Sequence, residues 1–423
     1  MARFGVCIFE DAAYRGFLPL SYSRAVFELR CGMLSLWEKT FREYDGDVSF
    51  YFMARPHLAE VLSERLPYPV NQLQDFDGES VLFLNGRLLS PPGLSQLVSL
   101  DGKSCCYFAG GELLACRVEA GELLRETARP EFFLDPGARE SLAGRLPRND
   151  VTATLLQYTW ELVNNNPGQI GTDFERSRQG GKIEGDVDER AVLYNARAVH
   201  VSQGARIDAG VVLDARGGPI FVGTGARISS SSRVEGPCAI SEDTHLVGGR
   251  YTGGCTFGPC CRIGGEVEQS VFQGHSNKYH EGFVGHSYVG EWVNLGALTT
   301  TSDLKNTYGC VSVIVDGRAV ETGLMKVGSL VGDFTKTGIG TLLDTGAVLG
   351  FSANVFGGKG VLPKDVPCFV WGGGEDFETY IPQRAVATAR VVMERRGVEM
   401  SPALERLMMH IFEATEGDRR RVM

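Results

Sequence analysis

The sequence predicts a chain of three parts: an α/β domain, a left-handed parallel β-helix and a C-terminal helical arm. Three observations predict this fold class. Glycine is concentrated in the middle, where residues 181–374 hold 36 of the 54 glycines. An apolar residue recurs there at six-residue spacing, and apolar runs alternate with helical patterns before it. The expected boundaries are 1–150 for the α/β domain, 151–180 for a helical linker, 181–374 for the β-helix and 375–423 for the arm.

The first 150 residues alternate strand-like and helical patterns, which favours a parallel sheet. Strands are expected at 6–9, 48–53 and 81–84, and helices at 33–44 and 56–65. A linker helix over 155–164 is expected to end at the run Asn164, Asn165, Asn166 and Pro167. In the arm, the pattern predicts a helix over 382–396 capped by Gly397, and a second helix that begins at Ser401 and Pro402.

The six-residue repeat of the middle segment predicts one short strand and one tight corner per step, and three steps complete a triangular coil. The apolar residue of each step points into the coil. The series comprises Val201, Ile207, Leu213, Val222, Ile228, Val234, Ile240 and Leu246, and it resumes with Val331, Thr337, Leu343, Leu349, Val355 and Val361. The period is interrupted between the two series, and breaks in a rigid repeat are where function is usually placed.

Composition excludes several classes of protein. The net charge is −10 and the pI is near 5.4, so a nucleic acid is not the expected partner. No apolar run approaches the roughly 20 residues of a membrane span, and the N-terminus lacks the layout of a signal peptide, so a cytoplasmic protein is expected. The eleven cysteines contain no CxxC pair, which predicts reduced thiols without a disulfide framework or a zinc site.

The interrupted region contains three histidines, His275, His280 and His286. Neighbours stacked in a three-sided coil lie about 18 residues apart, so histidines five and six apart are expected on different faces, and no metal site is predicted. A single histidine can serve as a general base near neutral pH, or it can be a hydrogen-bonded structural residue.

The same region resembles a known active site. The pattern formed by His280, Phe283, Gly285 and the run from Val293 to Thr299 is similar to the hexapeptide acetyltransferase domain of bifunctional enzymes that acetylate glucosamine 1-phosphate and then make UDP-N-acetylglucosamine. The sequence that follows, with Lys326, is most similar to the archaeal and Bacteroidetes types. The resemblance covers about residues 190–370.

This resemblance implies an acetyl-CoA-dependent N-acetyltransferase that forms trimers. It implies that His280 is the general base and that Glu266 orients it, as the catalytic residues. Asn294 corresponds to the asparagine that contacts the sugar, and Gly296, Ala297, Gly332 and Lys336 to the acetyl-CoA site. Small residues there let backbone N–H groups approach a developing oxyanion.

Three positions depart from the family pattern. Glu268 replaces a lysine that holds the substrate phosphate, Phe283 replaces an aromatic residue that carries a hydroxyl group, and Asp303 replaces an asparagine. A rebuilt sugar-phosphate site could take its cation from Lys278, Lys305 or Lys326, or the acceptor could differ. Lys278 lies two residues from His280, so a strand would place both side chains on the same side. An exposed lysine without a function is the alternative for Lys278.

The N-terminal part resembles a shortened sugar nucleotidyltransferase domain, since Pro19, Leu20 and Ser21 match a P-L-T element. The Gly-rich phosphate loop is missing after the first strand, and Arg87 stands where a Mg²⁺-binding aspartate is expected. The implied domain is therefore degenerate, with Mg²⁺ required only if it is active. Arg15, Arg24, Asn85 and Arg87 are its candidate nucleotide-binding residues.

Three functions follow from these patterns. The first is N-acetyl transfer from acetyl-CoA to an amino-sugar phosphate, with a degenerate nucleotidyltransferase-like domain. The second retains sugar-1-phosphate uridylyltransferase activity in the N-terminal domain. The third is a non-catalytic trimeric scaffold that binds sugar nucleotides. The expected partners are small molecules and two further copies of the chain, without nucleic acid or membrane.

Overall fold

The computed structural model describes residues 3–356, 360–373 and 376–421, and the chain forms two compact units. Unit 1 comprises Met1–Phe17, Ser23–Leu29 and Leu34–Gln157, and unit 2 comprises Leu18–Tyr22, Arg30–Met33 and Tyr158–Met423. Within the described residues, no helix is both long enough and apolar enough to span a bilayer. None of the eleven cysteines, all of them in the described residues, forms a disulfide.

Unit 1 is built on a six-stranded mixed sheet, whereas the alternating pattern favours a parallel one. Its strands in spatial order are β4 (Val48–Met53), β1 (Phe4–Phe9), β5 (Ser80–Asn85), β8 (Glu112–Glu119), β7 (Cys105–Ala109) and β9 (Arg148–Asp150). The first three strands in this order, β4, β1 and β5, are parallel, whereas β8 runs antiparallel to β5. The carboxyl ends of β1 and β5 therefore lie side by side, where open parallel sheets place their ligands.

Short helices and turns complete unit 1. The helices are α1 (Leu36–Phe41), α2 (Ala59–Arg65), α3 (Leu94–Leu97), α4 (Glu122–Thr127) and α5 (Pro136–Arg145), and the 3₁₀ turn η1 (Ala12–Phe17) follows β1. Two short strands, β6 (Leu88–Leu89) and β10 (Thr154–Leu155), pair near the end of the unit. The helix expected over 33–44 is shorter than predicted, since Ser35 and Glu38 form a capping box at its start.

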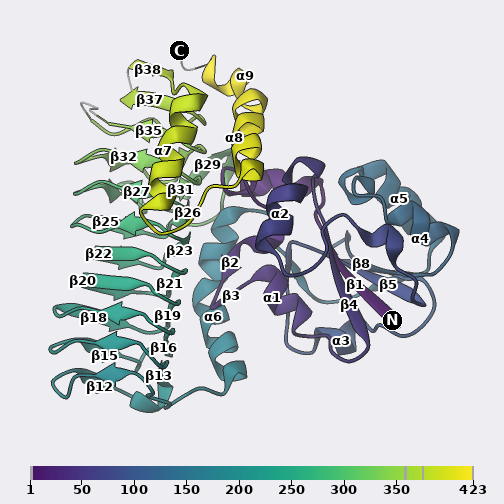
Figure 1. The fold of residues 1–423 in the computed structure, drawn as a ribbon, viewed down its shortest axis with the longest axis horizontal. Helices are drawn as coiled ribbons and strands as arrows, with labels where there is room; N and C mark the ends of the chain where they lie inside the picture. The colour runs from purple at the N-terminus through teal and green to yellow at the C-terminus, as the bar shows by residue number, and fades with distance from the viewer. Residues whose placement is uncertain (1–2, 357–359, 374–375, 422–423) are drawn as a thin grey trace. The chain divides into compact units, whose positions relative to one another are not determined.

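Unit 2 contains the predicted parallel β-solenoid, whose stacked strands run from β12 to β38 in Figure 1. The first face consists of β11 (Asp186–Val187), β14 (Arg206–Ile207), β17 (Arg227–Ile228), β20 (His245–Thr252), β22 (Arg262–Glu268), β24 (Asn277–Lys278), β27 (Asn294–Leu295), β32 (Lys336–Thr337), β35 (Asn354–Val355) and β37 (Val370–Gly373), which β38 (Asp376–Thr379) closes antiparallel.

The second face consists of β12 (Val192–Tyr194), β15 (Val212–Asp214), β18 (Ser232–Glu235), the later halves of β20 and β22, β25 (Phe283–Gly285), β28 (Thr300–Thr301) and β33 (Leu342–Leu343). The third face consists of β13 (Val199–Val201), β16 (Ile220–Val222), β19 (Cys238–Ile240), β21 (Cys255–Phe257), β23 (Val271–Gly274), β26 (Tyr288–Glu291), β31 (Leu330–Val331), β34 (Val348–Leu349) and β36 (Asp365–Val366).

The repeat positions fill the solenoid interior, as predicted. Ile207, Ile228, Leu246 and Ile263 stack in register on the first face and are at most 1% exposed. The prediction that Val361 points into the coil is wrong, because this residue is 59% exposed. It pairs with Leu342, which also points outward, whereas Leu343 points inward. A shift of one residue moves a side chain to the opposite face of a strand.

The linker helix α6 (Thr159–Ser177) continues through Pro167 instead of ending before it. Asn166 lies in the helix with no solvent exposure; it accepts a hydrogen bond from the Gly32 N–H and donates to the Gly254 carbonyl. The asparagine that suggested a helix end therefore binds α6 to the turn at Gly254. Tertiary contacts of this kind override local propensity.

Two further segments belong to unit 2. A hairpin of β29 (Ser312–Val315) and β30 (Arg318–Glu321) fills the detour between β28 and β31. The C-terminal helices are α7 (Pro382–Glu394), α8 (Pro402–Ala414) and α9 (Glu416–Arg419). Ser401 caps α8 by accepting a hydrogen bond from the Leu404 N–H at 3.1 Å, which confirms the predicted start.

Candidate active site

A groove of about 880 Å³ lies on the first face of the solenoid. It brings together five residues that the sequence assigns to the acetyltransferase site: His280, Asn294, Gly296, Ala297 and Lys336. The remaining lining residues are His245, Arg262, His275, Asn277, Tyr279, Trp292, Val293, Leu295, Ile339, Val392, Arg395 and Arg396. Asn277, Asn294 and Lys336 are in register on consecutive strands, so their outward side chains form one wall.

His280 lies in the exposed turn between β24 and β25, at the edge of the groove. Its ring makes no hydrogen bond to the described part of the chain, and it contacts the Tyr279 ring edge-on at a centroid distance of 5.2 Å. Glu266, expected to orient this histidine, lies on the second face with Oε1 3.9 Å from Arg250 Nη1. The histidine thus lines the groove without a carboxylate partner in this structure.

Lys278 points into the solenoid instead of toward the groove. It occupies the inward position next to Ile263 and is 1% exposed, whereas His280 is exposed, so the two side chains do not share a side. Its Nζ donates to the His280 carbonyl at 2.7 Å. Burial lowers the pKa of Lys278 to about 8, although Glu281 partly opposes this. The lysine supports the turn that carries His280 and is not an exposed surface residue.

Small residues and a backbone donor line the groove beside Asn294. The Gly296 N–H donates to the Thr337 carbonyl at 3.1 Å, and a Cβ at Gly296 would lie 2.6 Å from that oxygen. The Ala297 N–H has no hydrogen-bond partner within the described residues, while the Ala297 carbonyl accepts from Gly340. Lys336 Nζ donates to the Phe334 carbonyl at 3.0 Å, and burial lowers its pKa to about 8.

The other predicted substrate residues gather on the second face. Glu266 and Phe283 are paired in register on β22 and β25, as are Glu268 and Gly285. Lys326 Nζ lies 3.0 Å from Glu268 Oε1. A cation from the detour therefore reaches the position where Glu268 stands in place of the family's lysine. Among the three candidate lysines, Lys326 is the one that contacts Glu268.

His286 and Asp303 form a buried pair that sequence patterns did not suggest. His286 Nδ1 and Asp303 Oδ2 are 2.7 Å apart, and the two side chains are about one-tenth exposed. Burial by itself raises the pKa of Asp303, but His286 and Lys326 hold it below its ordinary value. The 17-residue separation equals one coil of the solenoid and could have indicated this contact.

Two predicted residues lie elsewhere. Lys305 donates from Nζ to the Cys310 carbonyl and stabilises the detour loop. Gly332 lies after β31 on the third face, where its N–H donates to Leu349 at 2.8 Å, and it does not line the groove.

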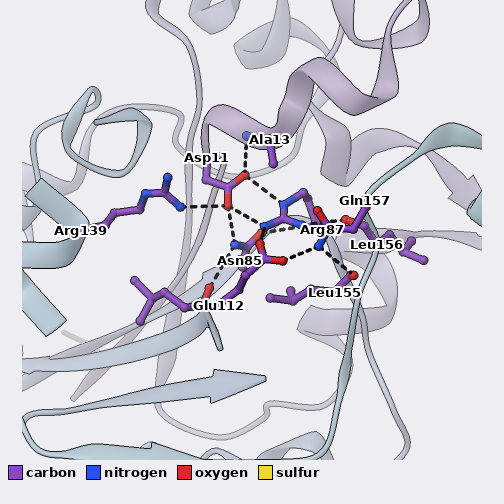
Figure 2. Close-up of polar contacts among 10 residues, drawn as sticks. Asp11, Ala13, Asn85, Arg87, Glu112, Arg139, Leu155, Leu156 and Gln157 are labelled. Atoms are coloured by element: carbon purple, nitrogen blue, oxygen red, sulfur yellow. Dashed lines mark hydrogen bonds and ion pairs between the residues drawn. The ribbon is translucent and has the colours of Figure 1, made fainter. Parts of the chain in front are cut away.

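Unit 1 has a second cluster, at the carboxyl ends of β1 and β5 (Figure 2). Asp11 Oδ1 accepts from Arg87 Nε at 3.0 Å, and Asp11 Oδ2 accepts from Arg87 Nη2 and Asn85 Nδ2, both at 2.9 Å. Arg139 approaches the same oxygen at 3.3 Å, and Glu112 accepts from Arg87 at 2.6 Å. Two candidate nucleotide ligands, Asn85 and Arg87, are therefore engaged within the protein.

The opposite charges of Arg87 and Asp11 are buried together and neutralise each other. Arg87 is 2% exposed and Asp11 1%. Burial favours a higher pKa for Asp11, but Arg87, Asn85 and Arg139 outweigh it and hold the pKa low. Burial favours a lower pKa for Arg87, and Asp11 and Glu112 outweigh it, so the pKa is raised.

The preceding residue, Glu10, makes a similar pair. Arg55 Nε donates to Glu10 Oε2 at 2.8 Å, and Arg55 Nη2 donates to the carbonyl of the buried Arg24 at 2.9 Å. The turn after β1 therefore presents two carboxylates where a phosphate loop would present N–H groups. Arg15 lies next to it, 5.5 Å from the Tyr14 ring.

Mg²⁺ does not fit this cluster. A hard divalent cation needs free carboxylate oxygens, and both oxygens of Asp11 already accept hydrogen bonds from cationic or amide groups. The described residues contain no group of three or more histidine, cysteine, aspartate or glutamate side chains able to hold a metal ion.

Residues 6–182 match the family model described as sugar nucleotidyl transferase. A bifunctional sugar-1-phosphate nucleotidylyltransferase/acetyltransferase of Sulfurisphaera tokodaii is 34% identical over 113 residues, which are 27% of each chain. The bifunctional protein GlmU of Gloeothece citriformis is 28% identical over 142 residues, covering 33% of this chain and 26% of that protein. The chain thus spans only about a quarter of the length of these curated relatives.

Two solved structures are also similar. The Arabidopsis UDP-N-acetylglucosamine acyltransferase has 11% identity and a TM-score of 0.29, covering 56% of this chain and 91% of that one. The Bacillus cereus N-acyltransferase AntD, in complex with dTDP-4-amino-4,6-dideoxyglucose and coenzyme A, has 12% identity and a TM-score of 0.16, covering 49% and 86%. The predicted resemblance to bifunctional nucleotidyltransferase/acetyltransferases is confirmed by the family model and the curated relatives.

Proposed function

We propose that this chain is an acetyl-CoA-dependent N-acetyltransferase acting on an amino-sugar phosphate such as glucosamine 1-phosphate. The observation that carries the proposal is the groove, which collects His280, Asn294, Gly296, Ala297 and Lys336 from three segments of the solenoid. The named activity of the Sulfurisphaera relative supports it.

His280 takes a proton from the amino group as the nitrogen attacks the thioester carbonyl. A new C–N bond forms, the C–S bond breaks and the thiol of coenzyme A leaves. The exposed ring of His280 has both nitrogens free of described protein partners, so one can face the amine. The Ala297 N–H, which has no partner in the described part of the chain, can donate to the oxyanion, and Asn294 can orient the sugar.

The acceptor phosphate is assigned to the second face. Lys326 and Glu268 form an ion pair there, and Phe283 provides an apolar surface beside them. The pair is partly exposed, so a phosphate can compete with Glu268 for the ammonium group. The first and second faces meet at the edge that carries His280.

The assembly is proposed to be a homotrimer. Three apolar side chains stand exposed at that edge: Tyr279 (48%), Leu298 (55%) and Ile339 (81%). A neighbouring copy that covers them would extend the groove against its own solenoid face. Ile339→Glu is expected to reduce the molar mass in light scattering from three chains toward one.

The N-terminal domain is proposed to be inactive in nucleotidyl transfer. Arg87 neutralises Asp11, so this carboxylate is not available to hold a Mg²⁺ ion that would stabilise a pyrophosphate leaving group. The competing hypothesis, a retained uridylyltransferase, requires pyrophosphate release from UTP and a sugar 1-phosphate.

The test compares two histidines six residues apart. His280→Gln is expected to lower kcat for acetylation of glucosamine 1-phosphate by about 100-fold or more, the usual contribution of a general base. His286→Gln is the control, because His286 is paired with Asp303 and does not line the groove. An unchanged rate in His280→Gln would remove His280 from the mechanism, and a larger loss in His286→Gln would point to the His286–Asp303 pair as the base.

The scaffold hypothesis makes a separate prediction. A chain that only binds sugar nucleotides shows no calorimetric signal with acetyl-CoA at millimolar concentration. Binding of acetyl-CoA with turnover of an amino sugar removes this hypothesis.

A further inference from the structure

The groove is cationic at one end, although the chain as a whole carries a net charge of −10. Its lining includes Arg262, Lys336, Arg395 and Arg396 as well as three histidines, and no aspartate or glutamate is among the described residues that line it. Glu291 approaches the groove only from beside His275, with Oε1 3.9 Å from His275 Nδ1. An excess of positive charge in a concave site attracts anionic ligands.

Two of these cations, Arg395 and Arg396, directly follow helix α7, which ends at Glu394. The chain then makes a left-handed turn at Gly397 (φ 69°), where the Val398 N–H donates to the Met393 carbonyl at 3.1 Å. The two arginines therefore lie between the end of the helix and the turn that terminates it. Cations at a helix C-terminus are favourable in themselves, but both side chains also line the groove.

Arg396 is held in a fixed position. Its Nη2 donates to Asn277 Oδ1 at 2.5 Å and its Nη1 donates to the Cys260 carbonyl at 3.3 Å. Arg262 donates from Nη1 to the carbonyls of Asp243 and Cys261. Burial lowers the pKa of Arg396, and the neighbouring charge of Arg262 lowers it further. Two guanidinium groups close enough to repel each other can both be stabilised by an anion between them.

We propose that Arg262, Arg395 and Arg396 form a phosphate-binding subsite for a nucleotide ligand of the groove. The cavity of about 880 Å³ is large enough for a nucleotide and not only for a sugar phosphate. The stacked rings of His275 and Trp292, 4.2 Å apart, form an aromatic wall beside these cations. This proposal rests on the proposed function, which identifies the ligands, and it extends the binding site to the residues that follow α7.

The phosphates can come from coenzyme A or from a sugar nucleotide, and the two sources differ in a measurable way. Calorimetry on the full chain would use coenzyme A, dephospho-coenzyme A and UDP-N-acetylglucosamine. Arg262→Gln and Arg396→Gln are expected to raise the dissociation constant of the bound ligand by about 10- to 100-fold, the range for lost charge-assisted hydrogen bonds. Arg227→Gln is the matched control, since Arg227 stacks on the same face two strands before Arg262 but does not line the groove.

Arg395→Gln guards against a folding defect, because Arg395 is exposed and its substitution leaves the Arg396 contacts intact. A loss confined to coenzyme A identifies the acyl donor as the occupant, and a loss confined to UDP-N-acetylglucosamine identifies a sugar nucleotide. Unchanged dissociation constants in all three variants, or no binding of any of the probes to the parent protein, would overturn the subsite. Turnover without this arginine dependence would leave the proposed function intact, and arginine-dependent binding without turnover would leave only the subsite.

Discussion

Lys278 occupies an inward column in which the residues stacked before it, Leu246 and Ile263, are apolar. A lysine there is costly, because its charge loses hydration and gains only one carbonyl acceptor. A pKa near 8, instead of 10.5, corresponds to about 3 kcal/mol that disfavours the charged form. The hydrogen bond to the His280 carbonyl gives this lysine a role in holding the His280 turn.

Lys278→Met tests this cost through the pH dependence of stability. Between about pH 8 and pH 10.5 the unfolded lysine keeps its proton while the folded one releases it, so the contribution of Lys278 to the stability of the folded protein becomes less unfavourable as pH rises in that window. The variant is expected to lose this contribution, so its stability relative to the parent protein falls between about pH 8 and pH 10.5, while the equal contribution of Lys336 remains in both proteins. Urea denaturation at about pH 7 and pH 10 measures it. Lys182→Met, at an exposed lysine, is the control, and an identical pH dependence in Lys278→Met would contradict the account.

Unit 1 also contains a buried basic side chain, that of Arg87. Arg87→Met is expected to destabilise this unit by about 3–5 kcal/mol, because it leaves Asp11 buried without its main partner. The double variant Asp11→Asn with Arg87→Met is expected to lose less than the sum of the two single losses. Additive losses in thermal unfolding would show that the pair does not act as a unit.

At the level of elements, the solenoid strands separate inward from outward positions in adjacent residues. Strand β17 offers a matched pair, since Ile228 is fully buried and Arg227 is exposed. Ile228→Ala is expected to cost about 2–5 kcal/mol through the lost contacts and the cavity, whereas Arg227→Ala stays within about 0.5 kcal/mol. Equal effects of the two substitutions in denaturant unfolding would be incompatible with this packing.

The sequence predicts local features well and distant contacts poorly. The six-residue period, the cap at Ser401 and the groove residues from Asn294 to Ala297 depend on short-range patterns. The His286–Asp303 pair could have been predicted from the sequence, because its separation of 17 residues makes one coil. By contrast, Lys326 reaches Glu268 across the detour, and Arg396 reaches Asn277 from 119 residues away. No periodicity connects such residues, and α6 passing through Pro167 depends on tertiary hydrogen bonds in the same way.

At the level of the whole molecule, the two units differ in how their charged residues are used. Unit 1 neutralises Asp11 with Arg87 and Glu10 with Arg55, so the strand ends that could bind a ligand are already occupied. Unit 2, within the described residues, lines a groove that also holds His280 with cationic groups and no carboxylate. This difference is the basis for our proposal that the solenoid carries the chemistry and that the sheet domain has a structural or binding role.

The most direct test of this division measures both half-reactions on one preparation of the full chain. Thiol release is followed with acetyl-CoA and glucosamine 1-phosphate, and pyrophosphate release with UTP, Mg²⁺ and N-acetylglucosamine 1-phosphate. The account predicts thiol release that depends on His280 and no pyrophosphate release. Pyrophosphate release without any thiol release would contradict it.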